Sequence, residues 1–238
     1  MVQQRQNPEM WFSAFLFARW TTSKPRLVLI FCLHYYLKVP HRRGGDEYDW
    51  KSVVETSQNI DFAPLEDSDW SHELRRMKGT FASKLNVYRT VAHHPRLLLA
   101  WADLRDHIVV NSALGPQHSE VVILRAGFHL GSHYEWSHHV SRARACGMDD
   151  QRIVSIKGDN QDMVAEDATL TRAVDELFAQ RKLSAETIDA VQGLVGKEGV
   201  LDVIATVGFY STLGYILNSF ETPLDDKITR EMAEQPLT

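Results

Sequence analysis

The sequence predicts an all-α protein, a compact multi-helix bundle with an irregular N-terminal extension. Two observations support this fold class. Apolar residues recur every three or four positions over most of the chain, and no stretch alternates apolar and polar residues as a strand does. With 238 residues and 44% hydrophobic content, the chain is long enough to form one domain with a substantial core.

The first part of the chain does not share this helical pattern. We interpret residues 1–59 as an N-terminal extension with short apolar runs. The run 27–37 is too short to cross a bilayer as a helix, which needs about 20 residues. We therefore expect no integral membrane segment and a cytoplasmic protein, with membrane association through residues 10–37 as the alternative. The helical domain is expected over residues 60–226, followed by a C-terminal tail over residues 227–238.

Helical spacing predicts the elements of that domain in order. A long amphipathic helix is expected over residues 70–91, and the next helix begins at Pro95. Beyond the central stretch, further helices are expected over residues 170–178, from Ser184 to about residue 195, and over residues 201–217. The last of these is apolar over most of its circumference, so we expect it to be buried, in part between subunits.

The central stretch, residues 116–148, contains the densest group of proton-transfer side chains in the sequence. One helix ends at Gly131, and Ser132 fits the N-cap of the next. Glu135 follows three residues later, as in a capping box. His139 lies four residues after Glu135, so the two side chains share a helix face. This pairing beside core residues makes the stretch the candidate active site.

Each candidate side chain also has a structural interpretation. Glu135 could serve only the cap, while a helix start lowers the pKa of a carboxyl and makes it a base. A near-neutral pKa for His139 suits acid–base catalysis, but buried histidines are common. Arg125 interrupts an apolar run, so it forms an ion pair or faces a cavity as a carboxylate clamp. Tyr134 could donate to a developing oxyanion or simply pack.

Composition argues against several other functions. The net charge is −5 with mixed signs, which does not fit a nucleic-acid-binding surface. Cys32 and Cys146 are far apart and form neither a disulfide framework nor a zinc motif. His129 and His133 flank Gly131, so one helix face does not present them together to a metal ion. We expect no metal and no cofactor.

The central stretch resembles the carboxymuconolactone decarboxylase-like family, which includes the D component of alkyl hydroperoxide reductase. The resemblance lies in Glu120 and in the Tyr-Glu-Trp-x-x-His pattern of residues 134–139, and it extends over residues 62–224. The peroxidase branch of that family has a Glu followed by Cys-x-x-Cys-x-x-x-His. Here Ser132 and Glu135 stand in the two cysteine positions, so the chain looks like the decarboxylase-like branch.

The resemblance implies a fold like that of alkyl hydroperoxide reductase D and a cofactor-free lyase. Such an enzyme would act by acid–base catalysis on a small carboxylic acid or lactone, by decarboxylation or a related isomerisation or ring opening. The alternatives are a hydroperoxide reductase and a non-catalytic helical binding protein. Family members form rings of three or six, which implies a homotrimer or homohexamer. The implied catalytic residues are Glu120, Glu135 and His139, and the implied substrate-binding residues are Arg125, Ser132 and Tyr134.

Overall fold

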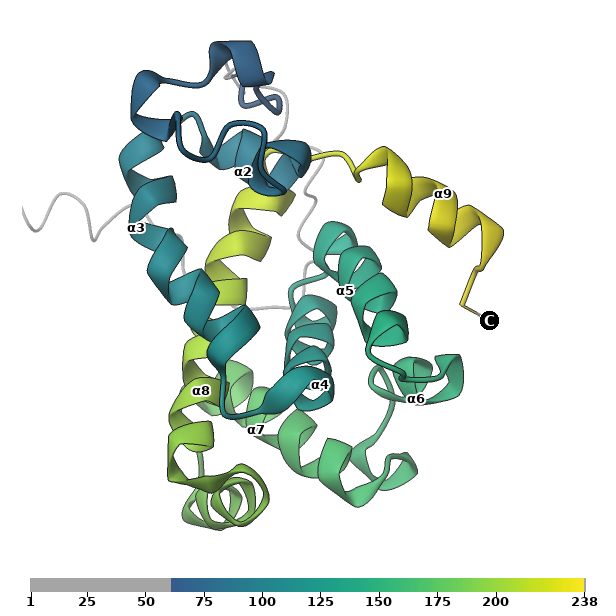
Figure 1. The fold of residues 1–238 in the computed structure, drawn as a ribbon. Helices are drawn as coiled ribbons and strands as arrows, with labels where there is room; N and C mark the ends of the chain where they lie inside the picture. Colours follow the sequence, from purple (N-terminus) through teal and green to yellow (C-terminus); the bar gives the residue numbers. More distant parts are fainter. Residues whose placement is uncertain (1–60, 238) are drawn as a thin grey trace, which may run out of the picture. The chain divides into compact units, whose positions relative to one another are not determined.

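The computed structural model describes residues 61–237, and all regular elements in that range are helices (Figure 1). The all-α prediction is confirmed for this part of the chain. The expectations for the N-terminal extension lie outside the described residues. The helices are α2 (Asn86–Val91), α3 (Pro95–Asp106), η6 (His107–Asn111), α4 (Gly115–His129), α5 (His133–Ala145), α6 (Asp150–Ser155), α7 (Ala165–Gln180), α8 (Ala185–Ser219) and α9 (Asp226–Glu234), with short 3-10 turns η3 (Asp67–Asp69), η4 (His72–Leu74), η5 (Ala82–Lys84) and η7 (Asn160–Asp162).

The predicted long helix over residues 70–91 is wrong. The structure instead has the turns η4 and η5 before the short helix α2. Polar side chains in between bind the backbone: the Gly79 N–H donates to Ser83 Oγ at 3.0 Å, and Thr80 Oγ1 donates to the Met77 carbonyl at 2.7 Å. Gly79 also has a φ of +72°, outside the helical region. Local side-chain-to-backbone hydrogen bonds of this kind compete with helix formation, and in this segment they replace the helical hydrogen bonds.

Helix α4 lies at the centre of the fold and packs against α5, α7 and α8 (Figure 1). Every residue from 119 to 127 is buried. Few helices in a single domain are buried on all sides, and such a helix can present polar side chains only to other protein groups. Polar residues of α4 must therefore find partners on the surrounding helices, and this requirement builds the site described below.

Ser132 begins α5 as the sequence predicts, because its Oγ accepts the Glu135 N–H at 3.4 Å. The reciprocal half of a capping box is not made. The Ser132 N–H donates to the Gly127 carbonyl at 3.0 Å instead. The Glu135 carboxylate is therefore not used by the cap, and it turns toward His139, whose Nε2 lies 3.4 Å away.

Helix α8 contains both helices predicted on either side of residue 196, joined at Gly196 with a non-helical φ of +77°. By length and composition α8 is apolar enough to cross a membrane. However, 56% of its most apolar window is buried inside the fold, as in the core helix of a soluble protein. Its buried face carries Tyr210 and Leu213 toward the candidate site, while Leu201 and Tyr215 stay exposed.

The segment expected to be a C-terminal tail contains helix α9, which lies beside α5 (Figure 1). Ile228 is buried, and Met232 packs against the main core. Ser141 Oγ donates to Glu231 Oε2 at 2.7 Å and links the two helices. The helix thus covers one side of α5, and Asp225 at its N-cap reaches the edge of the candidate site.

Candidate active site

His139 lies between two carboxylates, Glu120 of α4 and Glu135 of its own helix. Its Nδ1 is 2.5 Å from Glu120 Oε2, and its Nε2 is 3.4 Å from Glu135 Oε2. Glu120, Glu135 and His139 expose only 5%, 4% and 5% of their surface. The fold therefore brings the three side chains predicted as catalytic into one buried cluster.

The two carboxylates control the protonation of His139. Burial alone would lower the pKa of the imidazole, but Glu120 and Glu135 raise this pKa to about 9. Burial would likewise raise the pKa of Glu120, whereas the charge and hydrogen bond of His139 lower it. At neutral pH His139 is therefore an imidazolium, above the near-neutral pKa expected from the sequence, and both ring N–H groups face carboxylates.

Arg142 completes the cluster and is not among the site residues predicted from the sequence. Its Nε donates to Glu120 Oε1 at 3.0 Å, so both oxygens of Glu120 are bonded. Its side chain is 46% exposed and shields Glu120 from solvent. The available signal was helical spacing, because Arg142 follows His139 by three residues and Glu135 by seven and so shares their face of α5.

A cavity of about 70 Å³ lies beside Glu135 and His139. Three tyrosines line it, and the ring of one of them, Tyr210, meets the His139 ring edge-on at a centroid distance of 5.0 Å. Burial raises the pKa of both Tyr88 and Tyr210, so their hydroxyls keep their protons at neutral pH and can donate hydrogen bonds. The other lining residues are Leu85, Val87, Trp101, Arg105, Val109, Tyr134, His138, Arg142, Phe209 and Leu213.

Arg142 lines this cavity and two larger ones. It also lines a cavity of about 290 Å³ together with Glu120 and Cys146. On another side it lines a cavity of about 600 Å³ with His138 and Asp225. A void of about 150 Å³ is known to hold benzene, so a ring-sized ligand needs more room than the smallest cavity offers. Movement of the half-exposed Arg142 side chain would provide that room.

Comparison with known proteins agrees with this arrangement. Residues 95–179, which include both α4 and α5, match the carboxymuconolactone decarboxylase family. This part of the chain is a carboxymuconolactone decarboxylase family domain. The match covers Glu120, Glu135, His139 and Arg142, so the whole cluster lies inside the family domain. Among curated proteins, none matches the sequence of the chain.

Solved structures show the same fold. The debrominase Bmp8 C82A in complex with 2,3,4-tribromopyrrole has 17% identity and a TM-score of 0.57, and the match covers 75% of this chain and 98% of Bmp8. Apo Bmp8 has the same identity and TM-score, with 75% of this chain and 99% of Bmp8 covered. The carboxymuconolactone decarboxylase domain thus adopts an alkyl hydroperoxide reductase D-like fold.

Two of the predicted substrate-binding residues, Ser132 and Tyr134, already use their hydroxyl groups in hydrogen bonds within the protein. Ser132 is 1% exposed, and its hydroxyl caps α5. The Tyr134 hydroxyl donates to Asp225 Oδ2 at 2.6 Å and accepts the Val87 N–H at 3.1 Å. The Tyr134 ring lines the cavity and stacks on His138 at 4.3 Å, so it contributes a surface there and not a vacant donor.

Arg125, the third predicted substrate contact, is not among the lining residues of the three cavities and binds α7 instead. Its Nε and Nη2 donate to the two oxygens of Asp175 at 2.7 and 2.8 Å. Its Nη1 donates to the carbonyls of Ile156 and Gly158 at 2.7 and 2.9 Å. The carboxymuconolactone decarboxylase domain therefore uses Arg125 as a structural ion pair, with Asp175 as its partner.

In residues 61–237 no group of three or more His, Cys, Asp or Glu side chains is arranged to hold a metal ion. His129 lies 2.6 Å from Asp175, on the α7 side of the domain, and so does not converge with His139. Cys146 lines the cavity that contains Glu120, and burial together with the charge of Glu120 raises the pKa of its thiol. Thiol redox chemistry requires a thiolate, so this environment disfavours it.

Proposed function

We propose that the carboxymuconolactone decarboxylase domain is an acid–base lyase. Its proposed reaction is decarboxylation of a small carboxylic acid or lactone, or a related isomerisation or ring opening. One observation carries the proposal: the His139 imidazolium is held between Glu120 and Glu135 beside a cavity lined by protonated tyrosines. No redox step and no thiol are required for this chemistry.

The site offers what the loss of carbon dioxide requires. When the carbon–carbon bond to the carboxylate breaks, its electron pair moves into an enolate. Hydrogen-bond donors fixed in a buried site stabilise such an oxyanion, and Tyr88 and Tyr210 are suitable donors. The enolate carbon then takes a proton. With a pKa of about 9, His139 keeps its proton against water at neutral pH, yet it is acidic enough to protonate an enolate carbon.

The two carboxylates have different roles in this proposal. Glu120 holds Nδ1 of His139 and fixes the orientation of the ring, because its second oxygen is itself held by Arg142. Glu135 lines the cavity on the Nε2 side, where it can pass a proton between the ring and the substrate. Acid–base help of this kind contributes roughly 10²–10⁴ in rate, and positioning supplies the remainder.

The comparison structures support a small unsaturated substrate. The Bmp8 complex contains 2,3,4-tribromopyrrole, a small planar ring. A ring of that size suits the present cavity once Arg142 is displaced. Peroxide reduction is not proposed, because Ser132 and Glu135 occupy the positions of the peroxidase cysteines.

The test is a panel of small carboxylic acids and lactones, including carboxymuconolactone, incubated in deuterated water. We expect release of carbon dioxide and one solvent-derived deuterium at the former carboxyl-bearing carbon. Glu135→Gln and His139→Ala should each lower turnover by about 100-fold or more. Glu186→Gln, which changes a carboxylate that is 85% exposed on α8, should not.

Two results would contradict the proposal. Full turnover by folded Glu135→Gln and His139→Ala would mean that the cluster is structural. Binding of panel members by the wild-type protein, without turnover of any of them, would favour the alternative of a non-catalytic helical binding protein. Melting temperatures of each variant separate loss of chemistry from loss of the fold.

A further inference from the structure

Arg105, at the end of α3, lines the 70 Å³ cavity and carries one unpaired buried donor. Its Nη1 donates to Asp106 Oδ1 at 2.8 Å, and its Cζ lies 4.6 Å from the centroid of the Phe81 ring. Its Nε is buried and has no hydrogen-bond partner among the residues that the structure describes. A buried donor without an acceptor costs about 1–3 kcal/mol, a cost that an acceptor on a ligand would remove.

The pairing with Asp106 does not neutralise Arg105. The Asp106 side chain is 62% exposed while that of Arg105 is 17% exposed, so this ion pair is screened by solvent and weak. The charge of Arg105 and its side-chain hydrogen bond to Tyr88 also counteract the effect of burial on the pKa of the Tyr88 hydroxyl, which lines the cavity. Arg105 therefore still presents positive charge to a ligand.

The charged groups around the cavity leave positive charge in excess. Arg105, Arg142 and the His139 imidazolium are cationic, and Glu120 and Glu135 are anionic. With the solvent-screened Asp106 set aside, three cations against two carboxylates leave one positive charge, which a monoanion would balance. Loss of carbon dioxide moves the negative charge from a carboxylate to an enolate and does not remove it. The same excess charge therefore suits both the substrate and the intermediate.

The remaining walls favour a flat ligand. Trp101 of α3 and Phe209 of α8 meet edge to face, with ring centroids 5.6 Å apart, and both line the cavity. Val109 and Leu213 add aliphatic surface. Aromatic and aliphatic walls with a few convergent polar groups are typical of small-molecule sites.

We propose that Arg105 anchors the carboxylate of a small, planar, unsaturated monoanion. The ring or conjugated chain of this ligand would lie against Trp101 and Phe209, with its reacting carbon toward Glu135. This inference rests on the proposed function and names its substrate class. It also gives Arg105 the carboxylate-binding role predicted from the sequence for Arg125.

Binding of an unreactive probe tests the anchor separately from the reaction. Furan-2-carboxylate is a planar monoanion with a five-membered ring, and furan-2-carboxamide is its neutral counterpart. By calorimetry or ligand-observed NMR, the wild-type protein should bind the carboxylate at least about tenfold more tightly than the amide. Arg105→Ala and Arg105→Lys should each weaken carboxylate binding by about tenfold or more, because lysine retains the charge but lacks the planar donor group.

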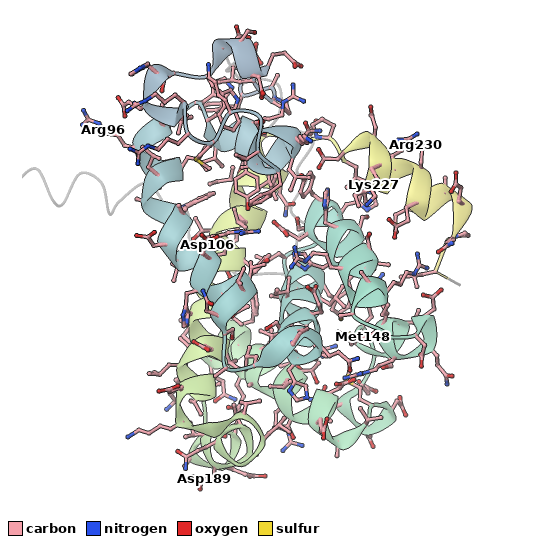
Figure 2. The ribbon with its side chains drawn as sticks, viewed as in Figure 1. Arg96, Asp106, Met148, Asp189, Lys227 and Arg230 are labelled. Carbon is pink, nitrogen blue, oxygen red and sulfur yellow. The ribbon has the colours of Figure 1, made fainter. Side chains whose placement is uncertain are left out.

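Arg96→Ala is the matched control. Arg96 is an exposed arginine at the other end of the same helix, and its side chain points away from the ribbon (Figure 2). This variant should bind furan-2-carboxylate as the wild-type protein does. If Arg105→Ala lowers the melting temperature, Arg105→Lys provides the comparison in a folded protein.

Several results would overturn the anchor. These are no binding of the carboxylate by the wild-type protein, equal binding of carboxylate and amide, or wild-type affinity in both Arg105 variants. Failure of the anchor and failure of the proposed reaction are distinguishable. Carboxylate binding that depends on Arg105, without turnover of any panel acid, would sustain the anchor and reject the reaction. Turnover that is unchanged in both Arg105 variants would support the reaction and reject Arg105 as the carboxylate anchor.

Discussion

His139 Nδ1 lies 2.5 Å from Glu120 Oε2, across the contact between α5 and α4. This bond joins two helices in the centre of the fold, so the candidate site and the core share a structural element. It also orients the imidazole, because a histidine whose Nδ1–H is held by a carboxylate presents Nε2 in a fixed direction. Here that direction is toward Glu135 and the cavity.

The protonation of His139 predicts how stability depends on pH. Its pKa in the folded protein, about 9, is above the ordinary value of 6.5. The stabilisation by its ion pairs is therefore fully present below pH of about 6.5 and is lost as pH rises through about 9. The free energy of unfolding should fall over this window by at most about 3 kcal/mol. Urea unfolding at several pH values should show this fall in the wild-type protein and less of it in His139→Gln. Equal pH dependence of the two proteins would contradict the assignment.

The same proton predicts how turnover depends on pH. In the proposed mechanism the imidazolium donates to carbon, so the rate should fall as pH rises through about 9. Removing the Glu120 carboxylate removes one of the groups that raise the pKa of His139. Glu120→Gln should therefore move this fall to lower pH, which a pH–rate profile of both proteins would show. An unchanged profile in a folded Glu120→Gln protein would mean that His139 is not the titrating acid.

Substitution of Arg125, unlike substitution of His139 or Glu120, should lower the stability of the fold strongly and change turnover little. Its guanidinium joins Asp175 to the carbonyls of Ile156 and Gly158. Arg125→Ala would leave the carbonyls of Ile156 and Gly158 without this donor and Asp175 with His129 as its remaining partner, and breaking such a largely buried pair costs about 3–5 kcal/mol. Thermal unfolding should show the loss, while turnover per folded molecule stays close to wild type. Normal stability with lost substrate binding would restore the role of carboxylate clamp.

The sequence predicted those parts of the site that depend on local spacing. Ser132 as a cap and the shared face of Glu135 and His139 follow from positions three and four residues apart on one helix. The proximity of Glu120 to His139 was predictable only from the family pattern, because 19 residues separate the two in the sequence. Arg142 had a local signal, its place on the same helix face, and that signal was not used.

The remaining features depend on contacts between distant segments. The partner of Arg125 lies 50 residues away on α7, and no local pattern selects Asp175 over other acids. Tyr210 reaches His139 from α8 because helix packing, not sequence spacing, places it there. In residues 70–91 a local feature overrode the periodic pattern. The apolar residues recur at helical spacing, but the turn at Gly79 interrupts the predicted helix.

The lack of the Cys-x-x-Cys motif in the sequence predicts the outcome of a peroxidase assay. Ser132 and Glu135 cannot exchange disulfides, and the raised pKa of the Cys146 thiol keeps it protonated. We expect no thiol-dependent consumption of hydrogen peroxide or organic hydroperoxides above background. Robust activity in the wild-type protein that disappears in Cys146→Ser would establish the hydroperoxide reductase alternative.

The exposed apolar side chains of α8 predict self-association. Leu201, Ile204 and Tyr215 are 66%, 42% and 62% exposed, and at 3.6 residues per turn they share one face of the helix. Contiguous exposed apolar surface usually marks an interface, and a cyclic homotrimer or homohexamer would bury it. Light scattering at micromolar concentration should give a multiple of three times the chain mass of 27.2 kDa. Ile204→Glu should reduce this mass, whereas Val164→Glu, at a 57% exposed apolar residue before α7, should not. A monomeric wild-type protein would refute the prediction, and an unchanged oligomer in Ile204→Glu would move the interface away from α8.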